Sequence, residues 1–357
     1  MERRTASTVS KQLMFIYGGN KMTNELDKNL DMYGRRIDYL RISVTDRCNL
    51  RCFYCMPTSG VEKMSHPQIL NFEDIERIVT AAANLGVSKI RFTGGEPLVR
   101  KDFSKLVNTI SRIPGIEDLS LTTNGVLLAQ QGEQLLEAGI NRVNISLDTL
   151  DNTKFSQITR GGTLAQVLKG KETARNLGLT PLKLNVVVIK GMNDDEIADF
   201  ARLTMNEDIE VRFIEYMPMS DGENWKKSYL PITDIKEKCS QVGKLLPVET
   251  AKGNGPAKYY RLEHGVGKIG FISAVSEHFC GDCNRLRLTS DGKIKTCLFS
   301  DEELDLRVAL KSNYDIERLL LKAILAKPSQ HNLSTIHSED MLTNDLNRKR
   351  GMSQIGG

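Results

Sequence analysis

The sequence predicts an α/β fold, a partial (β/α)6 TIM-type barrel with a C-terminal extension. The first observation is an alternation of short apolar segments with amphipathic helical ones between about residues 39 and 217, which is typical of parallel β/α architecture. The second is a set of polar motifs at the predicted strand ends, where barrel enzymes carry their chemistry. The third is two cysteine triplets, one early in the barrel and one in the extension.

Six strands follow one another in the barrel region. Their expected ranges are 38–45, 89–94, 118–123, 142–148, 182–189 and 210–217. The helix between the first two is typical of the connections, because Asn71 is a good N-cap and Gly86 a good terminator. Its apolar face is formed by Ile75, Ile78, Val79 and Ala82.

Each predicted strand has one apolar and one polar face, because residues two apart point to the same side. Leu40, Ile42 and Val44 are expected to pack under the helices. The opposite face carries the cations Arg41, Arg91, Lys183 and Arg212. A closed (β/α)8 barrel fills its lumen with apolar side chains, and unpaired buried cations are costly. The sequence therefore predicts an anionic ligand in the lumen, although any one of these residues could instead reach solvent at a strand end.

Cys48, Cys52 and Cys55 follow the first strand with C-x3-C-x2-C spacing. Three thiolates suit a cubane iron–sulfur cluster that leaves one iron open, whereas closed zinc sites use four ligands. The alternative is that the three are buried apolar side chains or half of a zinc site.

Cys280, Cys283 and Cys297 form a second triplet with C-x2-C-x13-C spacing. Either His278 or Cys239 could complete a zinc site here, so spacing alone does not separate zinc from a second cluster. Arg285 and Arg287 lie on one face if their segment is extended, and such a donor pair suits an anion such as a phosphate chain. Two solvated arginines would give the same pattern.

Other strand ends carry weaker motifs. Thr93-Gly94-Gly95-Glu96-Pro97 combines close backbone approach with a carboxylate, and Met217 could place a soft side chain against an aromatic ring. Turn chemistry alone explains the segments at Thr122 and Ser146.

Composition indicates a globular protein with a mild excess of positive charge, +4 over 357 residues, and no basic block, which argues against nucleic-acid binding. Seven cysteines in two triplets plus Cys239 argue against a disulfide framework and for metal in a reducing cytoplasm. No segment of the first 30 or so residues has the length of a signal-peptide core or a membrane span.

Three regions are expected from the sequence. Residues 1–32 form a disordered extension, residues 33–240 the barrel, and residues 241–357 a region with the second metal site and a Gly356-Gly357 tail. Within 301–350, a helix around residues 316–323 precedes a polar, irregular segment.

The first triplet, with Tyr54 directly before its third cysteine, resembles the signature of the radical S-adenosylmethionine (SAM) enzymes. The second triplet with its Arg-Leu-Arg, the T-G-G-E-P segment and the terminal Gly-Gly together resemble the molybdenum cofactor biosynthesis protein A family, the GTP 3′,8-cyclases. This resemblance runs from about Tyr39 to the end of the chain.

The resemblance implies two [4Fe–4S] clusters and SAM as cofactors, with GTP as the substrate. In that family the first cluster cleaves SAM, and the 5′-deoxyadenosyl radical removes the 3′ hydrogen of GTP. The C3′ radical then attacks C8 and gives 3′,8-cyclo-7,8-dihydro-GTP, the first intermediate of molybdenum cofactor biosynthesis. The implied partners are a reduced donor of flavodoxin or ferredoxin type and the downstream cyclic pyranopterin monophosphate synthase, while the oligomeric state stays open, a homodimer included.

The resemblance also assigns residues. Cys48, Cys52 and Cys55 would be the catalytic cluster ligands, and Cys280, Cys283 and Cys297 would hold the second cluster. The SAM contacts would be Tyr54, Gly95, Glu96, Ser146 and Met217. The GTP contacts would be Arg41, Arg91, Thr122, Lys183, Arg212, Arg285, Leu286 and Arg287, with Gly356 and Gly357 as a functional tail.

Two other functions remain open from the residues. A peptide- or protein-modifying radical SAM enzyme would share the first triplet and G-G-E-P without needing the cationic set. A non-enzymatic iron–sulfur or zinc protein would need neither the barrel nor an open iron.

Overall fold

The computed structural model describes residues 28–57, 64–218, 224–249, 255–312, 315–331 and 350–355. Most of the expected N-terminal extension, residues 1–27, and the predicted tail at Gly356 and Gly357 lie outside the described residues. Leu30 forms an isolated antiparallel bridge with Arg36, so the expected boundary at residue 33 falls within the turn that this bridge closes.

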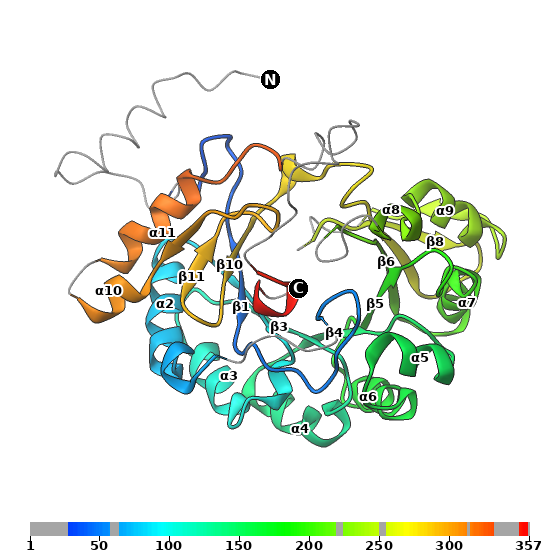
Figure 1. Ribbon diagram of the computed structural model, residues 1–357, viewed down its shortest axis with the longest axis horizontal. Coiled ribbons are helices and arrows are strands. Elements are labelled where there is room, and N and C mark those ends of the chain that lie inside the picture. Colours follow the sequence, from blue (N-terminus) through cyan, green and yellow to red (C-terminus); the bar gives the residue numbers. More distant parts are fainter. Residues whose placement is uncertain are drawn as a thin grey trace.

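The barrel is an open arc of parallel strands, and each of the six predicted strands is confirmed within its expected range (Figure 1). They are β1 (Tyr39–Ser43), β2 (Lys89–Thr93), β3 (Asp118–Thr123), β4 (Arg142–Ser146), β5 (Lys183–Val188) and β6 (Glu210–Glu215). Adjacent members of this series pair in parallel in chain order. The expected partial (β/α)6 barrel is therefore confirmed.

The extension lengthens this sheet at both edges, which the sequence did not reveal. Its strands are β7 (Leu245–Pro247), β8 (Lys258–Leu262), β9 (Lys268–Ile272), β10 (Arg285–Leu288), β11 (Lys293–Lys295) and β12 (Glu303–Asp305). β9 pairs in parallel with β6, and β10 pairs in parallel with β1. Residues 273–284 therefore lead from one edge of the parallel sheet to the other, and they carry the first two cysteines of the second triplet.

Helices cover the outer face of the arc (Figure 1). They are α2 (Phe72–Asn84), α3 (Phe103–Ser111), α4 (Leu128–Ala138), α5 (Asn152–Thr159), α6 (Leu164–Asn176), α7 (Ile197–Asn206), α8 (Asn224–Ser228) and α9 (Ile232–Ser240), with short 3₁₀ turns η2 (His66–Gln68) and η3 (Pro97–Val99). α2 begins as predicted, with the Asn71 side chain accepting a hydrogen bond from the Asp74 amide at 2.6 Å. Its predicted apolar face is buried.

The C-terminal region adds η4 (Cys280–Asp282), α10 (Arg307–Lys311), α11 (Ile316–Leu325) and α12 (Met352–Ile355). α11 is the helix expected around residues 316–323, and it packs against α2. α12 lies within the arc of strands, near its centre in Figure 1. Residues 332–349, where the irregular segment was expected, lie outside the described residues.

The hydrophobic core lies between the sheet and the outer helices. Leu40, Ile42 and Val44 are at most 1% exposed there, as the strand alternation predicted. Their neighbours on the opposite face point into the arc, which leaves a polar interior. Among the described residues, no helix combines the length and apolar character needed to cross a membrane.

Candidate functional site

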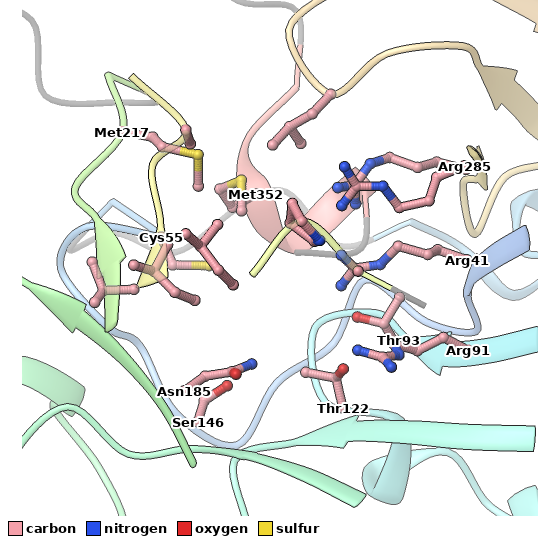
Figure 2. Close-up of a pocket in the computed structure, with 18 of the residues that line it drawn as sticks. Arg41, Cys55, Arg91, Thr93, Thr122, Ser146, Asn185, Met217, Arg285 and Met352 are labelled. Carbon is pink, nitrogen blue, oxygen red and sulfur yellow. The ribbon is translucent and has the colours of Figure 1, made fainter. Parts of the chain in front are cut away.

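One cavity inside the arc receives both cysteine triplets. The six thiols come from the loop after β1, from the segment between β9 and β10, and from the segment after β11. Figure 2 shows Cys55 and Met217 on one side of this cavity, and Arg41, Arg91 and Arg285 on the other. Cysteines from opposite ends of the barrel and extension, such as Cys48 and Cys297, therefore meet at a single site, which the sequence alone could not establish.

The first cysteine loop is held by the T-G-G-E-P segment. The Gly95 amide donates to the Thr45 carbonyl at 2.8 Å, and the Glu96 amide donates to the Arg47 carbonyl at 2.8 Å. A Cβ atom at Gly95 would lie 2.3 Å from the Arg47 carbonyl oxygen, which no side chain tolerates. The glycine is thus required for the close contact of two backbones.

The Glu96 carboxylate braces the same region. It accepts hydrogen bonds from the Leu98 amide (3.0 Å), the Thr123 hydroxyl (2.8 Å) and the Asn124 amide (2.7 Å). Burial raises the pKa of Glu96 to about 7. Glu96 lines the cavity as predicted for a SAM contact, but three protein donors already bind its carboxylate.

The first-triplet thiols lie in surroundings that disfavour a free thiolate. Burial raises the pKa of Cys48 to about 11 and that of Cys55 to about 12. The Leu50 amide donates to Cys48 Sγ at 3.3 Å, a contact that stabilises negative charge on the sulfur. A coordinated metal would supply the larger stabilisation, since a metal-bound thiol is deprotonated outright. None of the three thiols is in a disulfide, so all are available as ligands.

Tyr54, between the second and third cysteines, is fixed by a residue that the sequence interpretation did not assign to the site. Its hydroxyl donates to Asp148 Oδ2 at 2.6 Å, and Asp148 Oδ1 accepts from the Val187 amide at 2.9 Å. Burial raises the pKa of Asp148 to about 6. Asp148 follows β4 on its polar face, so strand alternation was the signal that could have identified it.

A row of arginines crosses the sheet beside the second triplet. In the pairing register, Arg41 on β1 is opposite Arg287 on β10 and opposite Arg91 on β2. Burial, together with Arg287 and Arg91, lowers the pKa of Arg41 well below its ordinary value. Burial also lowers the pKa values of Arg91 and Arg287, each to about 10. Three guanidinium groups in one buried row repel one another, so an anion in the cavity would stabilise them.

Several polar atoms that line the cavity and are themselves buried have no protein partner. Thr122 Oγ1, Asn185 Oδ1 and Arg212 Nε make no hydrogen bond, although each belongs to a cavity-lining residue. Figure 2 places Thr122 and Asn185 beside Ser146, below the cysteine and arginine sides of the cavity. Buried polar groups normally have partners, so these atoms indicate a polar ligand.

The second triplet has a different electrostatic environment. Although burial acts in the opposite direction, Arg285 and Lys327 lower the pKa of Cys283 to about 6. Arg285 Nη2 lies 3.6 Å from the Cys283 sulfur. Positive charge therefore favours the thiolate form of Cys283, which is the form that binds metal, whereas burial raises the pKa of Cys280.

The zinc alternative lacks its fourth ligand. His278 Nδ1 lies 3.1 Å from His331 Nε2, and Cys239 is fully buried in the hydrophobic core on α9. In the described part of the chain, no three His, Cys, Asp or Glu side chains are arranged around a point that could hold a single metal ion. A cubane cluster does not need its thiolates to meet at one point, so the triplets suit it better.

Two predicted GTP contacts are placed elsewhere. Lys183 forms an ion pair with Glu210 and a 3.3 Å hydrogen bond with the Tyr259 hydroxyl, and it does not line the cavity. Leu286 is 2% exposed and packs in the core, so it could meet a ligand only through its backbone. The remaining predicted contacts in the described residues do line the cavity.

The C-terminal segment reaches the first triplet. Met352 lines the cavity, and the Ser353 amide forms a hydrogen bond with the Cys55 thiol. Arg350 anchors the segment through ion pairs with Asp291 (2.7 Å) and Glu303 (2.6 Å). No motif in the sequence indicated the Met352 contact, because the contact depends on the return of the chain into the barrel.

Comparisons with known proteins agree with this architecture. Residues 42–204 match the radical SAM superfamily, and residues 209–333 match the family described as Molybdenum Cofactor Synthesis C. A GTP 3′,8-cyclase of Alkaliphilus oremlandii is 50% identical over 92% of this chain and 99% of its own length. Those of Pelotomaculum thermopropionicum and Listeria monocytogenes are each 48% identical, over 92% of this chain and 99% and 98% of their own lengths.

Among solved structures, Streptococcus suis SuiB has a similar fold. Its TM-score is 0.58 at 15% identity, over 90% of this chain and 76% of SuiB. SuiB bound to S-adenosylmethionine gives a TM-score of 0.57 at 14% identity, over 96% of this chain and 81% of that one. At these identities the likeness concerns the fold alone.

Proposed function

The chain belongs to the GTP 3′,8-cyclase family of radical SAM enzymes, and from that premise we propose how its cavity carries out the reaction. The enzyme converts GTP to 3′,8-cyclo-7,8-dihydro-GTP in the first step of molybdenum cofactor biosynthesis. The observation that carries the proposal is the meeting of two cysteine triplets and a buried arginine row in one cavity. The cofactors are SAM and two [4Fe–4S] clusters.

The two triplets divide the cluster sites between them. Cys48, Cys52 and Cys55 would hold the first cluster, whose bound form supplies the electron that cleaves SAM to a 5′-deoxyadenosyl radical. Cys280, Cys283 and Cys297 would hold the second. The fit rests on free thiols lining one cavity and on the absence of a closed four-ligand zinc set among the described side chains.

SAM would bind on the Cys55 side of the cavity. Tyr54, Gly95, Ser146 and Met217 line the cavity and would contact SAM, and Asp148 fixes the Tyr54 hydroxyl. Met217 offers a polarisable surface to the adenine ring. Glu96 would act mainly by bracing the loop, because its carboxylate is already bound by protein donors.

GTP would bind on the arginine side. The row of Arg41, Arg91 and Arg287 would bind the triphosphate, because a polyanion offsets the mutual repulsion of these guanidinium groups. Arg285, which lies beside Cys283, would contribute a further donor. Thr122 and Arg212 would use their unpartnered atoms for the nucleoside. Lys183 would shape the wall through Glu210 and Tyr259 instead of contacting the substrate.

The surrounding protein would orient the reactants and exclude water. A primary alkyl radical abstracts whatever hydrogen is nearest, so its target must be held still. The strand arc, the segment between β9 and β10, and α12 contribute to the walls of the cavity. Gly356 and Gly357, which lie outside the described residues, are proposed as a functional tail. We divide the chain near residue 240, since α9 packs against α7 and β6 of the barrel.

The cellular setting follows from the chemistry. The reaction needs a one-electron donor of flavodoxin or ferredoxin type, and its product would pass to a cyclic pyranopterin monophosphate synthase. Seven unpaired cysteines among the described residues suit a reducing cytoplasm. Homodimer formation is a further expectation that sedimentation would test.

Anaerobic incubation of the reconstituted protein with SAM, dithionite and GTP tests the function. Mass analysis should find 5′-deoxyadenosine and the cyclised nucleotide in equal amounts. SAM cleavage without nucleotide conversion would favour a peptide- or protein-modifying enzyme. Iron binding with no SAM cleavage would favour a non-enzymatic metal protein.

A further inference from the structure

Lys327 is a buried lysine beside the second triplet, and nothing above gives it a role in the reaction. It follows α11, is 3% exposed and lines the cavity. Its ammonium donates to the Thr296 carbonyl at 2.7 Å and to the Arg285 carbonyl at 2.9 Å. Thr296 directly precedes Cys297, and Arg285 lies two residues after Cys283. One ammonium thus ties together the two segments that present these cysteines.

The backbone of Lys327 is tied to the remaining cysteine. Arg35 donates to the Pro328 carbonyl at 2.7 Å, to the Ser329 carbonyl at 3.1 Å and to the Cys280 carbonyl at 2.8 Å. Asp31 fixes this guanidinium through a 2.5 Å ion pair. The segment 327–329 therefore connects to all three cysteines of the second triplet.

The charge of Lys327 has no acidic partner. Within the described ranges, no Asp or Glu forms an ion pair with its ammonium, and the side chains of Cys283 and Cys297 lie close enough to interact with its charge. An unpaired buried ammonium is costly. Hydrogen bonds to carbonyl groups offset only part of that cost. Two metal-bound thiolates would offset the rest.

We propose that Lys327 is a positioning residue for the second cluster. It holds together the segments that carry Cys283 and Cys297, and its positive charge raises the reduction potential of the cluster. The inference rests on the proposed function in one respect, that the second triplet binds a cluster. Reduction adds one negative charge to the cluster. A fixed positive charge nearby stabilises that state, and net charge and contacts at the sulfurs are known determinants of cluster potential.

The test uses variants that separate charge from hydrogen bonding. Lys327→Gln retains two N–H donors for the carbonyls but loses the charge, and Lys327→Arg retains the charge. Lys311→Gln, an exposed lysine on α10, is the matched control. Each is reconstituted in the full chain and, to isolate the second cluster, in a Cys48→Ala, Cys52→Ala, Cys55→Ala background. The readouts are iron content and the midpoint potential from an EPR-monitored redox titration.

The expected result is unchanged iron content in Lys327→Gln with a midpoint potential shifted to a more negative value. Lys327→Arg and Lys311→Gln should keep the potential of the unaltered protein. Loss of the second cluster from Lys327→Gln but not from Lys327→Arg would also support the charge role. An unchanged potential in Lys327→Gln, or cluster loss in both Lys327 variants, would overturn it. If the unaltered protein binds only about four irons, the proposed second cluster fails instead.

Discussion

Arg41 lies directly opposite Arg287 in the register between β1 and β10. The pairing joins a barrel strand to a strand of the C-terminal extension, so neither part of the chain forms this arginine row alone. Like charges opposite one another weaken a sheet, and burial increases that cost. A fold that retains such a pair sacrifices stability at a position where function uses the charge.

Arg287→Ala should weaken GTP binding about tenfold or more, because each charge-assisted contact contributes roughly 1.5–3 kcal/mol. Arg287→Lys should restore only part of the affinity, since an ammonium lacks the planar fork of donors. Equilibrium binding of GTP to the reconstituted protein gives the measurement. Arg112→Ala, at the exposed end of α3, is the control and should bind normally.

Uncoupled SAM cleavage provides the second readout for Arg287→Ala. SAM is proposed to bind on the Cys55 side of the cavity, so slow formation of 5′-deoxyadenosine should continue in the variant. Intact GTP affinity in Arg287→Ala would show that the row does not bind phosphate.

Arg41→Met should stabilise the protein in the absence of GTP. The change removes the central charge of the row and keeps a long, apolar side chain, and relief of the like-charge repulsion with Arg287 and Arg91 should contribute roughly 0.2–1 kcal/mol per pair. Thermal unfolding with and without GTP measures both effects. The variant should unfold at a higher temperature alone but lose the increase that GTP gives the unaltered protein. A lower unfolding temperature in the variant would mean that other contacts of Arg41 outweigh its repulsion by Arg287 and Arg91.

Strand alternation predicted the polar interior correctly because its period of two is fixed by backbone geometry. Arg41, Arg91 and Arg212 line the cavity as expected. Lys183 shares that polar face but forms an ion pair with Glu210. Alternation could not predict this pair, because it shows which face of a strand a residue is on and not which side chains surround it. Contacts between segments far apart in the chain could not be predicted from the sequence either.

The second triplet illustrates the same limit. Its spacing left zinc and a cluster equally open, and the choice depends on where His278 and Cys239 lie in space. The pairing of β10 with β1, which brings Arg287 beside Arg41, depends on the path of the whole extension. The sequence placed Arg285 and Arg287 on one face only on the condition that their segment is extended, and the structure meets that condition with strand β10.

Gly95→Ala should remove the first cluster while sparing the second. Its Cβ would lie 2.3 Å from the Arg47 carbonyl oxygen, so the loop carrying Cys48 must move. Iron content should fall from about eight to about four per chain, and SAM cleavage should be lost. Gly281→Ala is the matched control in the second cysteine segment, where an added Cβ meets no atom within 4 Å. Full iron content in Gly95→Ala would contradict the close packing of the two loops.

Arg350→Ala should release the C-terminal segment from the cavity. Arg350 joins Asp291 and Glu303, and these contacts fix α12 with Met352 in the cavity wall. Amide hydrogen exchange of residues 351–355 should accelerate about tenfold or more at neutral pH, and GTP cyclisation should fall while iron content stays constant. Arg202→Ala, which removes an exposed ion pair with Asp199, is the control and should change neither the hydrogen exchange of residues 351–355 nor GTP cyclisation.

The contribution of Arg350 should also depend on pH in a defined direction. Burial alone would raise the pKa of Asp291, but hydrogen bonds from Arg350 and Thr289 lower it below its ordinary value. A carboxyl group with a lowered folded-state pKa contributes stability that is complete above its ordinary pKa and disappears as the pH falls toward the lowered value. The difference in unfolding free energy between the unaltered protein and Arg350→Ala should therefore be constant from about pH 5 to 7 and shrink below about pH 4. Urea unfolding of cluster-free protein across this range measures it, since acid destroys iron–sulfur clusters. A difference that stays constant down to pH 3 would mean that Asp291 contributes nothing to the anchor and that Arg350 acts through other contacts.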